Sequence, residues 1–325
     1  MEKFSSFTRV IGRIPESEKE QIVQEKIDRF NDQYFEELVG KEKDKTLEEL
    51  KIISLANLAT NELCEKYGVD NLNILAKNVH IIKKNDWPKG RSAFYNPSLQ
   101  GIATCDEPVK INFLKKIFHE MVHFKSYNSM QITTGDSPEL ESYRVGLTIV
   151  KRKGDGIYFT NLNEAVTEQI TKNSLAVMLE DPIFAQEIKQ TKEIITSAPQ
   201  AITASGEMLF DENTIYAGIK QKETITHARE LSIIQKPVAE IITSVFSYES
   251  ERKFLDKLLN KIFERNPLKF QNKDEVFEVF ARGMMTGNIL PVGRLIENTF
   301  GVGVLRKIGE LDENEKAQER FINSL

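Results

Sequence analysis

The sequence predicts an α+β fold in which a small sheet and one half-buried helix lie between N-terminal and C-terminal helical regions, so that most of the chain is helical. Three observations support this prediction. Short apolar stretches separated by turn residues, typical of strands, occur between residues 79 and 105. Segments on both sides carry apolar residues at the 3.6-residue spacing of helices. The chain has 325 residues, 40% of them hydrophobic, and can bury a substantial core.

Residues 1–75 are expected to form a helical region that backs the sheet. Apolar residues follow helical spacing at Ile22, Ile27, Phe30 and Phe35. A second helix is expected to begin at Thr46, because a threonine followed three residues later by Glu49 is the signature of a capping box.

Residues 76–180 hold the predicted sheet and the helix that follows it. Strands are predicted at Val79–Ile82, Ser92–Tyr95 and Gly101–Cys105, with a turn at 96–98 between the last two. A helix is predicted for Lys110–Tyr127. One of its sides carries a stripe of apolar residues, namely Leu114, Ile117, Phe118, Met121 and Val122. Such a helix is half buried and holds the side chains at the edge of its stripe rigidly.

The pentapeptide HEMVH, His119 to His123, lies at the edge of this stripe. Two histidines four residues apart project from one face of a helix and can bind one metal ion, and Glu120 between them can take a proton from water. With 4 histidines in 325 residues, a pair at this spacing with an acid at the second position arises by accident only about 0.006 times. The alternative is a solvated helix face on which Glu120 pairs with Lys116.

Two histidines need a third protein ligand to complete a zinc site, and the best candidate is Glu164. It lies 45 residues after His119 (164 − 119), far enough for a second helix to pack against the first. It opens the segment NEAVTEQITKNSL, in which Asn161 or Asn163 is expected to cap a helix and Glu164 and Glu168 share one face.

These motifs resemble the gluzincin branch of the zincin metallopeptidases, in which HExxH is followed by a glutamate on a later helix. The likeness is greatest to the compact minigluzincins and looser to the catalytic region of anthrax lethal factor. It implies a zincin-like fold for residues 76–180, Zn²⁺ bound by His119, His123 and Glu164, and Glu120 as the general base. It also implies that Glu168 accepts a hydrogen bond from a ligand histidine. Many members carry Asp at that position, and an ordinary surface carboxylate is the alternative for Glu168.

The resemblance also implies a donor to the oxyanion of the reaction and a strand that faces the substrate. Tyr158, six residues before Glu164 and next to a predicted hairpin of 143–150 with 156–160, is one candidate donor, and Tyr248 is a second. His227 is a third and weaker one. Ile102–Cys105 is expected to be the edge strand along which a substrate lies.

The rest of the chain is divided into two regions. Residues 181–225 are predicted to be an insertion of mixed structure. Residues 226–325 are predicted to be a C-terminal helical region that completes the domain, with helices from about His227, an interruption near Pro237, and further helices at Glu249–Glu264 and Lys273–Met285.

Composition limits the classes of function. A net charge of −5 argues against nucleic acid as the main partner, because phosphate binding needs clustered positive charge. No stretch is apolar enough to span a membrane and no secretory signal is evident, so a cytoplasmic protein without a membrane partner is expected. Cys64 and Cys105 lack the spacing of a metal motif and are expected to be free thiols.

The function predicted from these patterns is a zinc-dependent metallopeptidase that acts on a peptide or protein substrate. The first alternative is a metal-binding zincin-like interaction or regulatory module, inactive or latent, whose cleft is blocked by its own C-terminal helices. The second is a metal-free helical scaffold in which HEMVH lies on the surface.

Overall fold

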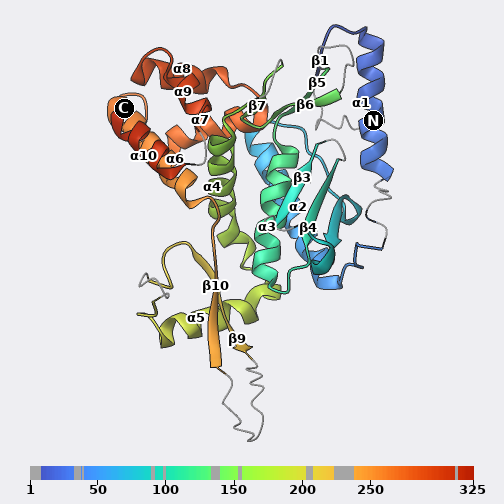
Figure 1. Cartoon of the computed structure of the whole chain (residues 1–325), viewed down its shortest axis with the longest axis vertical. Helices are drawn as coiled ribbons and strands as arrows, with labels where there is room; N and C mark the ends of the chain where they lie inside the picture. Colours follow the sequence, from blue (N-terminus) through green and yellow to red (C-terminus); the bar gives the residue numbers. More distant parts are fainter. Residues whose placement is uncertain are drawn as a thin grey trace, which may run out of the picture.

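The computed structural model has an α+β architecture of helices around three small sheets (Figure 1). It describes residues 9–32, 38, 40–88, 92–97, 100–132, 140–152, 156–202, 208–222, 238–311 and 314–325. None of the helices within these ranges is both long and apolar enough to cross a membrane.

A three-stranded sheet lies against helix α3 and the N-terminal helix α2. Its elements are α2 (Leu47–Tyr67), β2 (Val79–Ile82), β3 (Ala93–Asn96), β4 (Gly101–Cys105) and α3 (Lys110–Lys125). The strand order is β2-β4-β3, with β4 parallel to β2 and antiparallel to β3. Thr46 caps α2 through the predicted capping box with Glu49. Short 3-10 turns at Ala76–Asn78 and Lys84–Asp86 flank β2.

The prediction that Ile102–Cys105 is an edge strand is wrong, because β4 is the central strand of this sheet. Its side chains from Gly101 to Thr104 are buried, as those of a strand with neighbours on both sides should be. The outer side of β2 meets the segment around Glu42 through an isolated bridge to Ile82. Among the described strands of this sheet, β3 therefore forms the uncovered edge.

A second sheet of five strands lies at one end of α3 and connects it to α4. Its strands are β1 (Arg9–Ile11), β5 (Asn128–Ile132), β6 (Leu140–Val145), β7 (Thr148–Val150) and β8 (Ile157–Tyr158), in that order across the sheet. Helix α1 (Glu16–Asp32) follows β1 along one side of the molecule (Figure 1). The predicted hairpin is present as β7 paired with β8, and its tip at 153–155 lies outside the described residues. Its first arm, predicted as one segment of 143–150, is wrong in part, because a turn at 146–147 divides it between β6 and β7.

Helix α4 (Thr160–Met178) runs through the middle of the molecule and packs against α3 (Figure 1). The prediction that Asn161 or Asn163 caps it is wrong, because the helix follows Phe159, which has φ 62° and offers no side-chain cap. Both asparagines instead form tertiary hydrogen bonds: Asn161 donates to the Leu311 carbonyl, and Asn163 accepts from the Leu147 N–H.

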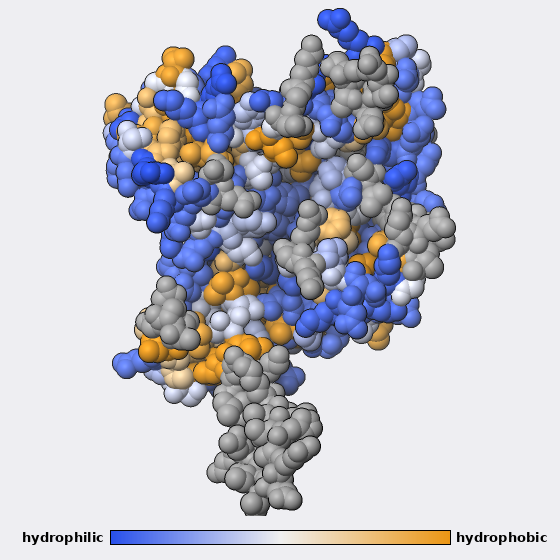
Figure 2. Space-filling model, viewed as in Figure 1, coloured by the Kyte–Doolittle hydropathy of each residue, from blue (hydrophilic) through white to orange (hydrophobic). Residues whose placement is uncertain are grey.

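Residues after α4 form a small unit below the main body in Figure 1. It consists of a 3-10 turn at Pro182–Phe184, α5 (Ala185–Ser197), and the antiparallel strands β9 (Thr214–Lys222) and β10 (Val238–Val245). Exposed apolar side chains gather around the base of this β9–β10 hairpin (Figure 2), at Ile202, Met208, Ile219, Ile242 and Val245.

The prediction that helices resume from about His227 is wrong for residues 238–245, which form β10. The sequence VAEIITSV is rich in β-branched residues, which favour strands, and pairing with β9 decides the outcome. His227 and Pro237 lie outside the described residues.

Five helices of the C-terminal region complete the core around α4. They are α6 (Glu249–Arg265), α7 (Lys273–Thr286), α8 (Leu290–Phe300), α9 (Val304–Gly309) and α10 (Glu315–Ser324). Their buried residues, such as Leu258 and Phe280, belong to the same apolar cluster as Phe118 of α3 and Val166 of α4. The two central helices are therefore held between the sheet and the C-terminal helices.

Candidate metal centre

Helix α3 carries both histidines of HEMVH on a face that meets α4. His119 is 6% and His123 7% exposed, while the apolar stripe through Phe118 and Val122 is fully buried. The four-residue spacing places the two imidazoles on consecutive turns. Their rings meet edge to face with centroids 4.8 Å apart. The prediction of a half-buried helix is wrong for this part of α3, since every residue from Ile117 to Lys125 is buried.

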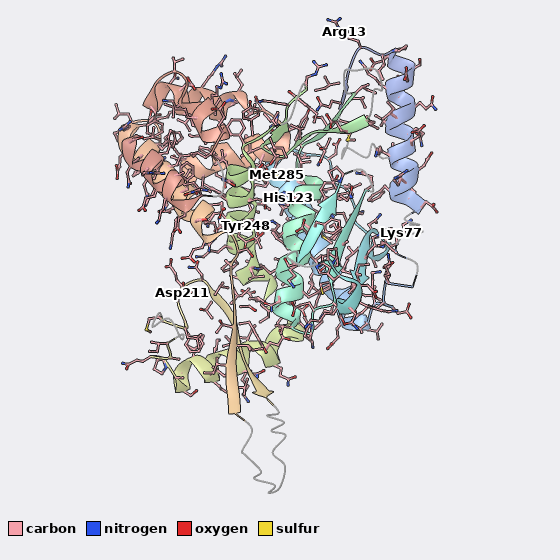
Figure 3. The ribbon with its side chains drawn as sticks, in the orientation of Figure 1. Arg13, Lys77, His123, Asp211, Tyr248 and Met285 are labelled. Atoms are coloured by element: carbon pink, nitrogen blue, oxygen red, sulfur yellow. The ribbon has the colours of Figure 1, made fainter. Side chains whose placement is uncertain are left out.

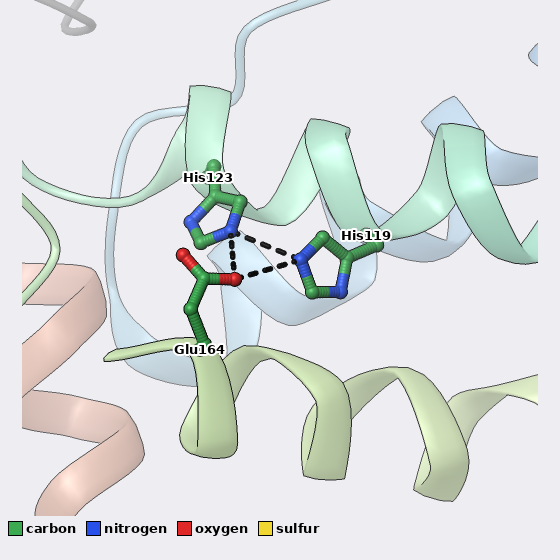
Figure 4. Close-up of side chains that lie close together, drawn as sticks. All are labelled: His119, His123 and Glu164. Atoms are coloured by element: carbon green, nitrogen blue, oxygen red, sulfur yellow. Dashed lines mark hydrogen bonds and ion pairs between the residues drawn. The ribbon is translucent and has the colours of Figure 1, made fainter. Parts of the chain in front are cut away.

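Glu164, in the second turn of α4, points between the two histidines (Figure 4). Its Oε2 lies 3.2 Å from Nε2 of His119 and 3.3 Å from Nε2 of His123, and the two Nε2 atoms are 3.1 Å apart. These three ligand atoms are close enough to one another to hold one metal ion. The structure thus brings together the three residues that the sequence separates by up to 45 positions.

The other ring nitrogen of His119 is fixed by Glu168, one turn after Glu164 on α4. Nδ1 of His119 lies 2.7 Å from Oε2 of Glu168, which is 1% exposed. The backbone N–H of Ser247 donates to the second oxygen, Oε1, at 2.5 Å. A carboxylate in this position accepts the Nδ1 proton of His119 and leaves the Nε2 lone pair facing Glu164 and His123. Glu168 is therefore not a surface carboxylate.

His123 is held differently, through Asn163. Oδ1 of Asn163 accepts the Leu147 N–H at 2.8 Å, which orients the amide. Its Nδ2 lies 3.4 Å from Nδ1 of His123. Among the described residues, no carboxylate bonds Nδ1 of His123 as Glu168 bonds Nδ1 of His119, so the two histidines have unequal surroundings.

Glu120 lies on the side of α3 that faces the uncovered edge of the sheet. The backbone N–H of Tyr95 in β3 donates to its Oε2 at 2.8 Å, and the residue is 9% exposed. Burial raises the pKa of Glu120, and the nearby positive charge of the two histidines opposes this only in part. Lys116 pairs with Glu107 at 2.6 Å, so the alternative pairing of Lys116 with Glu120 is not present.

The charges of the cluster are strongly coupled. Burial disfavours the charged form of His119, but hydrogen bonds to Glu164 and Glu168 outweigh it and raise its pKa to about 10. Burial likewise opposes the charge on Glu164, yet the two histidines hold its pKa well below the usual range. Because this raised pKa keeps His119 protonated near neutral pH, a metal ion bound by these groups would have to displace a proton from it.

Tyr248 joins the site from the start of α6. Its ring stacks on His119 with centroids 5.6 Å apart and an angle of 15° between the planes. Figure 3 shows Tyr248 and His123 in the middle of the molecule. Burial, followed by the charges of Glu164 and Glu120, raises the pKa of Tyr248, so its hydroxyl stays protonated near neutral pH.

Tyr158 lies in β8, where it pairs with Ile149 and the Lys151 ammonium stands 5.5 Å from its ring. Within the described parts of the chain, neither its strand pairing nor its ring contact joins Tyr158 to the histidines or to Glu164. His227, the third candidate, lies outside the described residues.

A cleft of about 480 Å³ opens beside Glu164 and Tyr248. Its walls come from the first turns of α4, α6 and α10, and its lining residues are Thr160, Asn161, Glu164, Tyr248, Glu249, Ser250, Glu251, Lys253 and Glu315. Of the three candidate ligands, Glu164 therefore lines this cleft.

Sequence reasoning missed three groups that hold the site: the Tyr95 N–H, the Ser247 N–H and the Lys115 ammonium. The backbone groups carry no signal in a sequence. Lys115 carries a weak one, because it lies four residues before His119 and thus on the same face of α3.

Comparison with protein-family models, with curated proteins and with solved structures finds no match to this chain.

Proposed function

We propose that this protein is a zinc-dependent metallopeptidase with a zincin-like catalytic core. The observation that carries the proposal is the spacing of the three ligand atoms of His119, His123 and Glu164, at 3.1, 3.2 and 3.3 Å. Ligands about 2.0–2.1 Å from a tetrahedral ion lie roughly 3.3 Å apart, so this triangle fits one face of a zinc site. Two histidines and one glutamate leave the fourth position open, as catalytic zinc sites do.

Zinc held in this way supplies Lewis acidity, which polarises a peptide carbonyl and makes water a better nucleophile at neutral pH. Glu120 is then the proton carrier. Its Oε2 is occupied by the Tyr95 N–H, which leaves Oε1 to take a proton from water and to pass it to the leaving amine. The burial that raises its pKa brings the carboxyl group nearer to the range in which it exchanges protons.

In the same reaction, Tyr248 is the hydrogen-bond donor to the carbonyl oxygen of the substrate. Its hydroxyl is kept protonated, and its ring is fixed by stacking on His119. A donor that is already in place when negative charge develops on that oxygen lowers the barrier.

β3 takes the role that the sequence assigned to β4, as the strand that faces a substrate. Cys105 donates to the Ser92 carbonyl, so in this antiparallel pair the backbone groups of Ala93 and Tyr95 point away from β4. The Tyr95 N–H reaches Glu120, which puts this edge beside the proton carrier. An extended peptide pairing with β3 would therefore pass the metal centre.

A metal-binding module without protease activity is the second candidate. It is favoured by the contribution of α6 and α10 to the walls of the cleft, since these helices could limit access to it. Cleavage of an unstructured substrate such as casein by the full chain would exclude this module.

The test combines metal analysis with cleavage of casein. We expect one zinc per chain in the wild type, loss of zinc in His119→Ala, and retention of zinc in Glu120→Gln with cleavage reduced about 1,000-fold or more. His80→Ala is the matched control, since His80 is also buried but pairs with Glu42 away from the site. Stoichiometric zinc in His119→Ala would contradict the assigned ligands.

A further inference from the structure

The junction between β10 and α6 is tied to the metal centre through Ser247. Its N–H donates to Glu168, its hydroxyl accepts from Lys115 at 2.9 Å, and its carbonyl accepts from Arg252 at 3.0 Å. All three polar groups of one residue are therefore engaged, by α4, α3 and α6 in turn.

Lys115 is the group that ties this junction to the ligand helix. It is 9% exposed and lies one turn before His119 on α3. Its ammonium donates to the Val245 carbonyl at 3.0 Å and to the Ser247 hydroxyl, and stands 3.7 Å from Oε1 of Glu168. The three donors of one ammonium thus face two junction residues and the carboxylate that orients His119.

Tyr248 follows directly and has a backbone conformation that needs support. Its φ of 53° and ψ of 45° lie in the left-handed region, which is strained for a residue with a Cβ and persists only where the surrounding structure enforces it. The bonds to Ser247 and Val245 fix the chain just before this point. The Tyr248 ring, which follows directly, stacks on His119.

We propose that Lys115 is a positioning residue for the metal centre, which holds the β10–α6 junction so that Ser247 supports Glu168 and Tyr248 lies over His119. The proposal rests on the proposed function. Lys115 touches neither ligand atoms nor substrate in this role. It acts through Glu168, which orients the ligand His119, and through Tyr248, which contributes the hydroxyl donor.

The variant that tests this is Lys115→Met, which keeps the length of the side chain and removes its donors. We expect its zinc affinity, measured on the metal-free protein by competition with a chromogenic chelator, to fall about 10-fold, as when a partner of a ligand histidine is lost. We expect kcat to fall about 10-fold or more with little change in KM. Lys116→Met is the matched control, because Lys116 pairs with Glu107, and should stay within twofold of wild type.

A double-mutant cycle separates positioning from a general loss of stability. If Lys115 places Tyr248, the loss of kcat caused by Tyr248→Phe should shrink to less than about threefold in the Lys115→Met background. Ser247→Ala, which removes only the hydroxyl acceptor, should show the same non-additivity with smaller single effects. It serves as the second test if Lys115→Met does not fold.

Unchanged zinc affinity in folded Lys115→Met, together with additive effects of Tyr248→Phe, would overturn the positioning role and leave the proposed function standing. Absence of zinc binding and cleavage in the wild type would overturn the proposed function and this inference with it.

Discussion

The two tyrosines that the sequence offers as oxyanion donors have different surroundings. Tyr248 stacks on His119 and its pKa is raised by burial and by the carboxylates of the site, whereas Tyr158 faces Lys151 in the hairpin. Distance along the chain favoured Tyr158, which lies six residues before Glu164, whereas Tyr248 comes near Glu164 only in the fold.

We expect Tyr248→Phe to lower kcat about 10- to 100-fold with a small change in KM, since a donor that acts on developing charge affects mainly the chemical step. Tyr158→Phe is the matched control and should stay within twofold of wild type. Steady-state kinetics on a fluorogenic peptide would measure both. An inverse result would assign the donor to Tyr158.

Lys125, the last residue of α3, is a buried cation that pairs with no carboxylate among the described residues. Its ammonium donates to the carbonyl and Oδ1 of Asn57 and to Oδ1 of Asn61, and it is 4% exposed. Burial lowers its pKa to about 7. The folded state therefore gives up this proton more readily than the unfolded state does.

The free energy of unfolding depends on pH because the folded and unfolded states bind the Lys125 proton with different affinities. Between about pH 7 and 10.5 the unfolded chain keeps the Lys125 proton and the folded chain does not, so the free energy of unfolding rises with pH, by up to about 1.4 kcal/mol per unit. Lys125→Met should lose this rise. Urea unfolding from pH 6 to 10 would measure the difference between the two proteins, and parallel curves would contradict the prediction.

How far single residues could be predicted depends on how local their signal is. His119, Glu120 and His123 form one short motif, and Glu164 begins a segment with a helical pattern, so their spacing alone identifies them as candidate site residues. The Tyr95 N–H, Lys115 and Ser247 act through contacts between segments far apart in sequence, which no local pattern encodes.

At the scale of elements, the turn between β6 and β7 is fitted closely to α4. Gly146 has φ +57°, and a Cβ there would lie against Oδ1 of Asn163 and Cγ of Met284. Asn163 precedes Glu164 and contacts His123. The packing of this turn thus reaches the metal centre through one residue.

We expect Gly146→Ala to destabilise the protein by about 2–4 kcal/mol, combining backbone strain with displacement of Asn163, and to weaken zinc binding severalfold. Gly68→Ala isolates the strain, since Gly68 has φ +70° with open space around its Cβ position, and should cost only about 1 kcal/mol. Chemical denaturation and chelator competition would compare them. Equal effects would show that crowding at Asn163 is unimportant.

The elements that the sequence located well are those with strong local signals. The capping box at Thr46 and the apolar stripe of α3 predict helices that are present. The order of strands in the sheet was missed because Ile102–Cys105 carries no sign of which neighbours it has. β10 was missed because its β-branched run can suit either a strand or a buried helix, and only pairing with β9 decides.

At the scale of the whole molecule, the C-terminal helices share one core with α3 and α4, which carry the three candidate ligands. α6 packs on α4 and α7 packs on both, whereas α10 contacts mainly α6 through residues such as Ile322. The C-terminal region is therefore not a detachable cover over the cleft.

A chain ending at residue 311, without α10, should fold, bind zinc and melt at a lower temperature, because it loses one peripheral amphipathic helix. A chain ending at residue 248 should not fold, because α6 and α7 supply buried residues to the common core. Circular dichroism and gel filtration would distinguish these results. A folded, zinc-binding chain of 248 residues would contradict the single core, and proteolytic activity that appears only in that chain would favour a latent enzyme.

The β10–α6 junction also fixes the number of residues between the hairpin and the helix. One residue added between Val245 and Glu249 would displace the following chain by about 3.3 Å, more than a hydrogen bond tolerates. Ser247 could then no longer form its hydrogen bonds to Lys115 of α3, Glu168 of α4 and Arg252 of α6 at the same time. The length of this short connection is consequently constrained, and an engineered variant that grafts another segment onto the hairpin should keep the number of residues between β10 and α6.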